Sequence, residues 1–599
     1  YKEASAESYT SVELDKVLEY KITGLKSAVT YQIRLKAVEK TTESESEYSD
    51  VKEVTTLVKA GFPMVANNAD EFIAILSNAD GLRSASATDE IQIKANLDFT
   101  GKTLPAGPIF PGALVGNGNT ISGITSDHAI FASVGSVSDL TIDESCTFAA
   151  TKAGFLAALA AESTGTFTNV VNKANVSVVI AGAGDATVAV GGLVAVGVSK
   201  MDGCKNYGNV TYTAGASYGA LVGGLAGYND GAMNKCENHG NVTMSVESLS
   251  AYGVVKSIDN LPIHIGGLAA QLGANAPVTE SVNRGTVDYD ITKVENLAVS
   301  CGTNRPRMGG IVGLTQSSIT SSTNEGIVDV NVVTSDSSIF SGKNYPINVG
   351  GISGGAPVDA SGASGADITS CTNSGAITCV TYCKGTKGTI PTCGGIVAHP
   401  GYEDATQTNT ITRCENTGSI SATTFTIARV GGISGGSGSV TYCKNTGTID
   451  GHLSIEDGNI GGIIGWLDKG HKFEYNESYC TLSNTRAPGT KGTSEVGGLI
   501  GQHGNYDSCP GEGRGCKVRC DISYDYSNEK WYGMLLGYFW STHTVVLGTE
   551  DEPIIVLGGS MTYSGGTTQI TAENYTKYTN HSSAGGNSGS KPFTVHVKF

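Results

Sequence analysis

Short runs of β-branched and other apolar residues, separated by glycine and small polar residues, recur through most of the chain. Residues 242–244 (Val-Thr-Met) and 420–422 (Ile-Ser-Ala) are typical, because apolar and polar side chains alternate in them as they do in half-buried strands. No long segment of this part has the apolar spacing of an amphipathic helix. The pattern predicts an all-β protein built from many short strands.

These strands belong to a repeat whose clearest copy spans residues 191–210. A copy begins with two glycines followed by Leu or Ile, and most copies continue with Cys-x-Asn-x-Gly-x-Val/Ile. The nine doublets are 30 to 44 residues apart, a period typical of stacked repeats. They begin at Gly191, Gly223, Gly266, Gly309, Gly350, Gly394, Gly431, Gly461 and Gly497.

A parallel β-helix accounts for the repeated residue types, since each copy would form one coil and coils stack at roughly 4.8 Å. Leu225, Leu268 and Ile311 are then expected to lie one above another in a narrow core. Five cysteines at one repeat position are expected to form a buried column, and the motif asparagines a hydrogen-bonded ladder. The cysteines are Cys204, Cys236, Cys371, Cys414 and Cys443, and the asparagines are Asn206, Asn238, Asn283, Asn324, Asn373, Asn416 and Asn445.

The two motifs together resemble the GLUG-type repeat of large bacterial surface proteins, over roughly residues 100–550. The clearest match is Gly-Leu-Ala-Gly-Tyr-Asn at 224–229, followed by Cys-x-Asn-x-Gly-x-Val from Cys236. The resemblance implies a parallel β-helix on the surface of a Gram-negative bacterium. It does not imply one biochemical function, because adhesins and protease-associated regions share this scaffold.

Residues 1–57 resemble the C-terminal part of a fibronectin type III domain, with Gly24-Leu25 at its conserved turn and Tyr31 at its tyrosine corner. Half a sandwich cannot bury a core. We therefore expect its missing strands, an export signal and an outer-membrane anchor of the lipoprotein kind upstream, so that the membrane is contacted only through that anchor.

Three further segments complete the expected organisation. Residues 58–100 are expected to contain a linker, a capping helix and the first coil, because Asn67 and Asn68 precede acids and an apolar face. Residues 101–540 are expected to form the GLUG-type β-helix, and residues 541–599 its closing coils and C-terminal cap. Longer connections are expected on one side of the rod, as a candidate binding surface. These connections are 245–264, 288–308, 331–348 and 379–393.

The composition excludes some partners. The formal net charge is -17 with no basic stripe, which argues against nucleic acid and anionic membranes. Charged residues make up only 16% of the chain, so solubility must come from Ser, Thr and Asn, as in many exported bacterial proteins. No run of 18 apolar residues is present.

Candidate chemistry is sparse. A β-helix polysaccharide lyase or glycoside hydrolase would need clustered acids, and here the acidic pairs are scattered through loops and the ten histidines are isolated. We expect no catalytic residue, no metal and no cofactor. Cys509, Cys516 and Cys520 form one cysteine group, and Cys379, Cys383 and Cys393 a second. Neither has a clear fourth zinc ligand, so the alternatives are a disulfide in one or both groups or free buried thiols.

Aromatic residues gather late in the chain. Trp466, Trp531, Tyr532, Tyr538 and Trp540 could stack on sugar rings, or they could plug the end of the rod. The predicted function is a non-enzymatic, exported cell-surface protein whose β-helix binds a glycan or a host or bacterial surface ligand. The alternatives are a β-helix lyase or hydrolase, and a structural surface-layer or fibre subunit.

Overall fold

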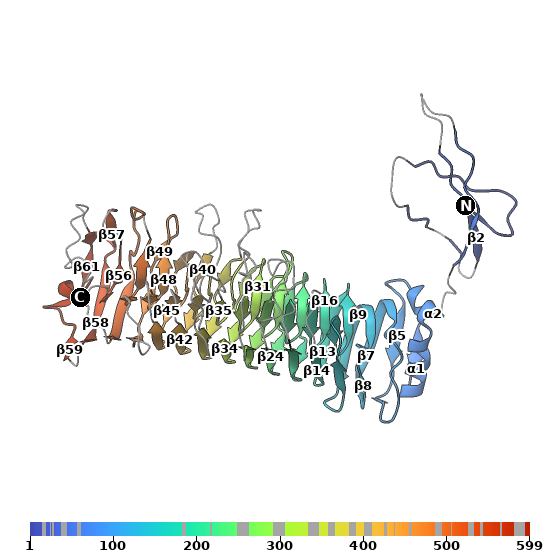
Figure 1. The fold of residues 1–599 in the computed structure, drawn as a ribbon, viewed down its shortest axis with the longest axis horizontal. Coiled ribbons are helices and arrows are strands. Elements are labelled where there is room, and N and C mark those ends of the chain that lie inside the picture. Colours follow the sequence, from blue (N-terminus) through green and yellow to red (C-terminus); the bar gives the residue numbers. More distant parts are fainter. Residues whose placement is uncertain are drawn as a thin grey trace.

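A computed structural model shows the fold (Figure 1). It describes residues 1–14, 20–23, 25–26, 29–37, 45–56, 61–181, 187–215, 219–247, 263–291, 306–332, 347–356, 366–381, 391–399, 410–424, 428–436, 438–453, 458–485, 494–504, 506–524, 532–539, 543–563, 566–579 and 593–599. Most of each predicted excursion therefore lies outside the described residues.

From residue 64 onward the described chain winds into a parallel β-helix, drawn as a long rod in Figure 1. Equivalent strands of successive coils pair in parallel and in register, which confirms the predicted architecture. Each regular coil contributes up to five short strands, and each strand belongs to one column that runs along the rod. We describe these columns in chain order from the glycine doublet.

The first column is an 11-stranded sheet, and all of its strands except the first and the last end at the first glycine of a doublet. Its strands are β11 (Phe155–Ala157), β15 (Val188–Gly191), β20 (Ala220–Gly223), β25 (Ile263–Gly266), β30 (Arg307–Gly309), β35 (Asn348–Gly350), β39 (Thr392–Gly394), β43 (Arg429–Gly431), β47 (Gly458–Gly461), β52 (Ser494–Gly497) and β55 (Tyr532–Gly533).

The second column follows the doublets. Its strands are β12 (Ala160–Ser163), β16 (Val194–Gly197), β21 (Ala226–Asn229), β26 (Ala269–Leu272), β31 (Val312–Thr315), β48 (Ile464–Leu467), β53 (Ile500–His503) and β56 (Leu536–Tyr538). Single bridges through Ser353, Val397 and Ser434 continue the column between β31 and β48.

Two columns of very short strands come next. The third contains β17 (Lys200–Asp202), β22 (Met233–Asn234), β27 (Val278–Thr279), β32 (Ile319–Thr320), β36 (Ile368–Thr369), β40 (Thr410–Thr412), β44 (Ser439–Thr441) and β49 (Phe473–Glu474). The fourth contains β18 (Lys205–Asn206), β23 (Glu237–Asn238), β28 (Val282–Asn283), β33 (Thr323–Asn324), β37 (Thr372–Asn373), β41 (Glu415–Asn416), β45 (Lys444–Asn445) and β50 (Glu477–Ser478).

The fifth column closes each coil. It contains β14 (Asn175–Ile180), β19 (Val210–Ala214), β24 (Val242–Val246), β29 (Val287–Ile291), β34 (Val328–Val332), β38 (Ile377–Thr381), β42 (Ile420–Thr424), β46 (Ile449–Leu453), β51 (Thr481–Asn484), β54 (Lys517–Tyr524) and β58 (Ile554–Tyr563). Its strands alternate buried and half-buried residues, the pattern that predicted them.

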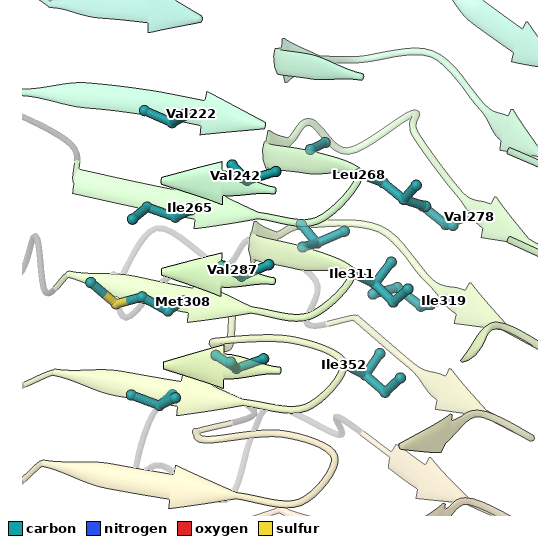
Figure 2. Close-up of a cluster of buried hydrophobic side chains, with 14 of the residues drawn as sticks. Val222, Val242, Ile265, Leu268, Val278, Val287, Met308, Ile311, Ile319 and Ile352 are labelled. Atoms are coloured by element: carbon teal, nitrogen blue, oxygen red, sulfur yellow. The ribbon is translucent and has the colours of Figure 1, made fainter. Parts of the chain in front are cut away.

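The core is one continuous file of stacked apolar side chains. Leu268, Ile311 and Ile352 lie one above another in successive coils, as Figure 2 shows, and all three are fully buried. Val242 and Val287 of the fifth column stack in the same way beside Ile265 of the first (Figure 2). This confirms the predicted single-file core.

The asparagine ladder is also confirmed, and it extends by one residue to Asn172. In each step the Nδ2 of one asparagine donates to the Oδ1 of the next, at 2.8 or 2.9 Å, from Asn172 to Asn445. Most of these amides also donate to the motif glycine, as Asn238 does to Gly240 O at 2.8 Å. The buried amides are therefore satisfied from coil to coil.

The second glycine of each doublet lies against this ladder, which explains why the two motifs occur together. A Cβ atom on Gly224 would lie 2.0 Å from Gly267 O and 2.5 Å from the Asn238 side chain. Only a residue without a side chain leaves room for both the next coil and the buried amide. The five motif cysteines are buried as predicted, and their thiols meet backbone groups of neighbouring coils.

A helix covers the first coils, as predicted. Helix α1 (Ala69–Ser77) begins at Asn68, whose side chain accepts from the Glu71 N–H at 2.9 Å, and Glu71 accepts from Asn67 N in return. Phe72 and Leu76 enter the same core as the irregular first strands. A second short helix is α2 (Ala79–Arg83), and the first strands are β4 (Met64–Ala66), β5 (Glu90–Ile93), β6 (Leu97–Asp98), β7 (Ile109–Ser122), β8 (Thr125–Ser126), β9 (Phe131–Ile142), β10 (Thr147–Ala150) and β13 (Thr166–Asn172).

The two ends of the chain form smaller sheets. At the C-terminal end, β57 (Val545–Leu547) pairs with β60 (Phe593–Val595), and β58 pairs with β59 (Gly566–Gln569) and β61 (Val597–Lys598), near a 3-10 helix, η4 (Tyr575–Tyr578). At the N-terminal end, β1 (Lys2–Glu3), β2 (Thr30–Ile33) and β3 (Lys52–Thr55) form an antiparallel sheet. There the Tyr31 hydroxyl accepts from Lys26 N at 2.9 Å, a contact of the tyrosine-corner type. The fibronectin type III resemblance stays a prediction.

Candidate functional site

The doublets create a second packed region outside the main core. Neighbouring residues of a strand point to opposite faces. Val222 of β20 belongs to the main core, whereas the adjacent Leu221 belongs to a separate apolar cluster with Ala195 and Ala270. Each first-column strand therefore presents one side chain per coil to the other side of the sheet.

These side chains form what we call the upstream row, because each stands two residues before a doublet. Every member pairs in register with the next along the rod, and all are at most 6% exposed. The row consists of Ala189, Leu221, His264, Arg307, Asn348, Thr392, Arg429, Asn459 and Glu495.

A downstream row runs beside it, formed by the residue five positions after the first glycine of each doublet and, in the last coil, by the residue five positions after Gly533. Several members are half-buried and so keep part of their surface in solvent, among them Gln271, Trp466 and Tyr538. The row consists of Val196, Tyr228, Gln271, Leu314, Gly355, His399, Gly436, Trp466, Gln502 and Tyr538.

The two rows face each other across a corner between the first two columns, here called the outer corner. Tyr228 packs against the apolar cluster that contains Leu221. The guanidinium carbon of Arg429 lies 3.8 Å from the centre of the Trp466 ring. Asn459 Nδ2 donates to Gln502 Oε1 at 2.9 Å.

The last glycine of the Gly-Gly-Leu-x-Gly motif explains how the strands come so close at this corner. A Cβ atom on Gly465 would lie 2.8 Å from both the N and O atoms of Val430. A Cβ atom on Gly501 would lie 2.9 Å from the N and C atoms of Ile460. The repeated glycine therefore keeps the strands close together along the corner, while the residue types of the two rows differ from coil to coil.

The chemistry of the outer corner changes along the rod. In the first regular coils it is apolar, with Ala189, Leu221 and Val196 in contact through one cluster. From His264 onward most upstream-row members are polar, although they remain almost fully buried. A buried polar row has to be held by hydrogen bonds or charges, so the later coils are chemically specialised.

Hydrogen bonds and neighbouring charges act on two parts of this polar row. Asn459 Nδ2 donates to Glu495 Oε2 at 2.5 Å as well as to Gln502, so one amide joins both rows. Burial, together with the positive charge of Arg307, holds the pKa of His264 well below its ordinary value. His264 is therefore a neutral imidazole at physiological pH.

Two of the five predicted aromatic residues lie in the downstream row. Trp466 and Tyr538 stand on either side of Gln502, two coils or roughly 9.6 Å apart. The Trp466 indole N–H has no hydrogen-bond partner among the described residues. The structure thus brings together an aromatic face, a planar cation and an amide.

The other three predicted aromatic residues do not join this group. Tyr532 pairs in register with the core residue Val496 and is 7% exposed, with its ring 4.2 Å from that of Tyr524. The Tyr532 side chain therefore packs in the core at the end of the rod, which favours the alternative that this residue plugs the rod. Trp531 and Trp540 lie outside the described residues.

The predicted cysteine groups form no disulfide among the described residues. Cys379 pairs in register with Val330 and Ala422, whereas Cys393 pairs with Val349 and Val430, so each thiol fills an apolar core position of its own column. Cys516 and Cys520 are fully buried free thiols, Cys509 is a half-buried one, and Cys383 lies outside the described residues. Burial raises the pKa of Cys379 and of Cys516 to about 12.

Sequence reasoning missed the buried polar residues Arg429, Asn459, Glu495 and Gln502. Their signal was present, since each has a fixed distance from a glycine doublet at a position where the residue type changes from copy to copy. In the described part of the chain, no group of three His, Cys, Asp or Glu side chains is arranged to hold a metal ion. No helix among these residues is long and apolar enough to cross a membrane.

Comparison with known proteins adds little to this description. Neither a protein-family profile nor a curated protein matches the chain. One similar solved structure is described as a "putative immunoglobulin A1 protease from Bacteroides ovatus". It is 15% identical, with a TM-score of 0.32, and the match covers 57% of this chain and 84% of that one.

Proposed function

We propose that this chain is a non-enzymatic, exported cell-surface protein whose β-helix binds a glycan at the outer corner, at Trp466 and Tyr538, which stand on either side of the buried Gln502. The observation that carries the proposal is the half-buried Trp466 ring, which is backed by Arg429 and flanked in register by Gln502. Sugars are bound by aromatic faces that stack on their apolar sides and by a few fixed polar groups.

The polar network beneath the row supports this assignment. Asn459 orients Gln502 from the opposite side of the corner, and Glu495 orients Asn459. Fixed side chains of this kind lose little conformational freedom when a ligand binds. The rod places Trp466 and Tyr538 at a constant separation, so they would contact different rings of one oligosaccharide.

Export to a bacterial surface is the second part of the proposal. It is supported by the low content of charged residues, the repeat's resemblance to GLUG-type surface proteins, and a rigid rod suited to holding a binding site away from a cell. A bacterial or host surface glycan is the proposed partner, and the chemistry attributed to the protein is binding without bond cleavage.

The test is binding of the 599-residue chain to an oligosaccharide array, followed by titration calorimetry with the glycans that bind. Trp466→Ala is expected to weaken binding by at least about tenfold, because stacking area and about 1.4 kcal/mol or more are lost. Trp466→Phe should retain part of the affinity. Tyr207→Ala is the matched control, since this exposed ring stacks on His239 elsewhere on the rod. Unchanged binding by Trp466→Ala would reject the site.

A further inference from the structure

The asparagine ladder ends before the rod does, and two cysteines stand where the pattern changes. The ladder position passes in register from Asn445 to Ser478 and then to Val518. Two residues further on, the position held by Gly447 is taken by Cys480 and then by Cys520. The Asn-x-Gly pair of the earlier coils thus becomes Ser-x-Cys and Val-x-Cys.

This replacement removes a hydrogen-bonding system from the last coils. In earlier coils an amide joins each coil to the next and to the motif glycine, as Asn283 does with Asn324 and Gly285. Ser478 is too short to continue the chain of amides, and Val518 has no polar group. These coils therefore lack the interaction that connects their predecessors.

The two cysteine side chains occupy the space that this leaves. Cys480 Sγ and Cys520 Sγ are 3.5 Å apart, and the Ser478 hydroxyl lies 3.3 Å from each. Both residues are in the core, and the adjacent Thr481 and Asp521 pair in register. The strand spacing of roughly 4.8 Å falls within the Cα separations that a disulfide spans, roughly 4.4 to 6.8 Å.

We infer that Cys480 and Cys520 become a disulfide when the chain folds in an oxidising environment, which joins the last coils covalently where the asparagine ladder has ended. A small-molecule disulfide such as oxidised glutathione is the oxidant. One cysteine thiolate attacks it and releases one reduced thiol, and the second thiolate then attacks the mixed disulfide and releases the other. Two protons leave the cysteines, and the oxidant gains two electrons.

The cysteine column of the earlier coils provides an internal comparison. Cys371 and Cys414 also stand in successive coils, but Cys414 Sγ accepts from Cys371 N at 3.4 Å and donates to Ile368 O at 3.5 Å. Those thiols interact with each other, but each is also held by backbone groups, since Cys371 Sγ donates to Thr369 O at 3.4 Å and Cys414 Sγ to Thr412 O at 3.5 Å. They are expected to remain thiols under the conditions that link Cys480 to Cys520.

The experiment folds the full chain with oxidised glutathione or with a reductant, then denatures it, alkylates it and maps its peptides by mass spectrometry. The expected result is one linked peptide pair containing Cys480 and Cys520, with an unfolding midpoint about 3 °C above that of the reduced chain. In Cys480→Ser and in Cys520→Ser this difference should vanish, and in Cys516→Ser it should persist. The inference is overturned if both cysteines of the chain folded with oxidised glutathione are fully alkylated after denaturation, or if either is linked to another partner.

Discussion

The asparagine ladder and the outer corner run along the same coils but treat sequence variation in opposite ways. In the ladder, Asn206 to Asn445 are identical residues that satisfy one another, so the chemistry of each step is the same. In the upstream row, His264, Arg307 and Asn348 follow one another at positions just as well aligned and just as buried.

The two sets of positions therefore have different roles within one repeat. A position that must join every coil to the next has to keep one residue type, because each side chain is both donor and acceptor for its neighbours. A position whose side chain finds different partners from coil to coil can change, as Arg429 does with Trp466 and Asn459 with Gln502. The later outer corner uses this freedom to gather cationic, amide and aromatic groups, which is why we place the binding site there.

The largest effect is expected from breaking the ladder in its middle. Asn283→Ala removes the acceptor of Asn238, the donor to Asn324 and the donor to Gly285 O, and it leaves a cavity. We expect the free energy of unfolding to fall by about 3 to 4 kcal/mol, measured by urea denaturation.

Gln271 of the same coil provides the matched comparison for this variant. It lies in the downstream row and is half-buried, so Gln271→Ala should cost about 0.5 kcal/mol or less. Equal losses in the two variants would show that ladder and corner contribute alike, and the proposed division between them would fail.

A smaller loss is expected from filling the space beside the ladder. Gly224→Ala puts a methyl group within 2.0 Å of Gly267 O and 2.5 Å of Asn238, so the coils must separate locally. We expect a loss of about 2 to 3 kcal/mol in the same denaturation experiment. Gly61→Ala is the control, because a Cβ there has no atom within 4 Å. A Gly224→Ala protein as stable as the parent would mean that the doublet does not set the distance between coils.

Repetition also determined how much of this molecule could be predicted. The β-helix, the core file of Leu268 and Ile311 and the ladder all followed from residues that recur at one phase, because stacking in register turns a period into a contact. The burial of individual aromatic and cysteine residues near the C-terminal end of the rod could not be predicted in the same way. Tyr532 and Cys520 lie where the repeat has lost its period, so their depth depends on how the final coils close.

Trp466 was predicted as an aromatic residue but without its surroundings. Its neighbours Arg429 and Gln502 are 37 and 36 residues away in sequence, and only the register of the coils brings them together. A comparison of positions at a fixed distance from each doublet would have found this row. Reading conserved motif positions alone could not, because the row is defined by where the repeat varies.

Stacking of identical residues is unfavourable when they carry the same charge. A pair of stacked aspartates therefore gives the smallest expected effect, and a specific test of why the ladder consists of neutral asparagines. In the same two coils that stack Asn283 on Asn324, Asp288 stacks in register on Asp329. Burial, with the charges of Asp329 and Asp290, raises the pKa of Asp288 from 3.8 to about 6. Above pH 6 the folded state holds this carboxylate at a cost, whereas below about pH 4 the group is protonated in both states and the cost is absent.

Asp288→Asn should therefore stabilise the protein at pH 7, by about 1 kcal/mol once solvent screening of the half-buried carboxylate is allowed for, and the gain should disappear as the pH falls from 6 to 4. Thermal unfolding at pH 4, 5, 6 and 7 measures the difference. Asp127→Asn changes the net charge equally at an exposed position and should not reproduce the pH-dependent gain. A gain that is the same at every pH would mean that neither burial nor repulsion by Asp329 penalises the Asp288 carboxylate, and that an amide is preferred at this position for its hydrogen bonds alone.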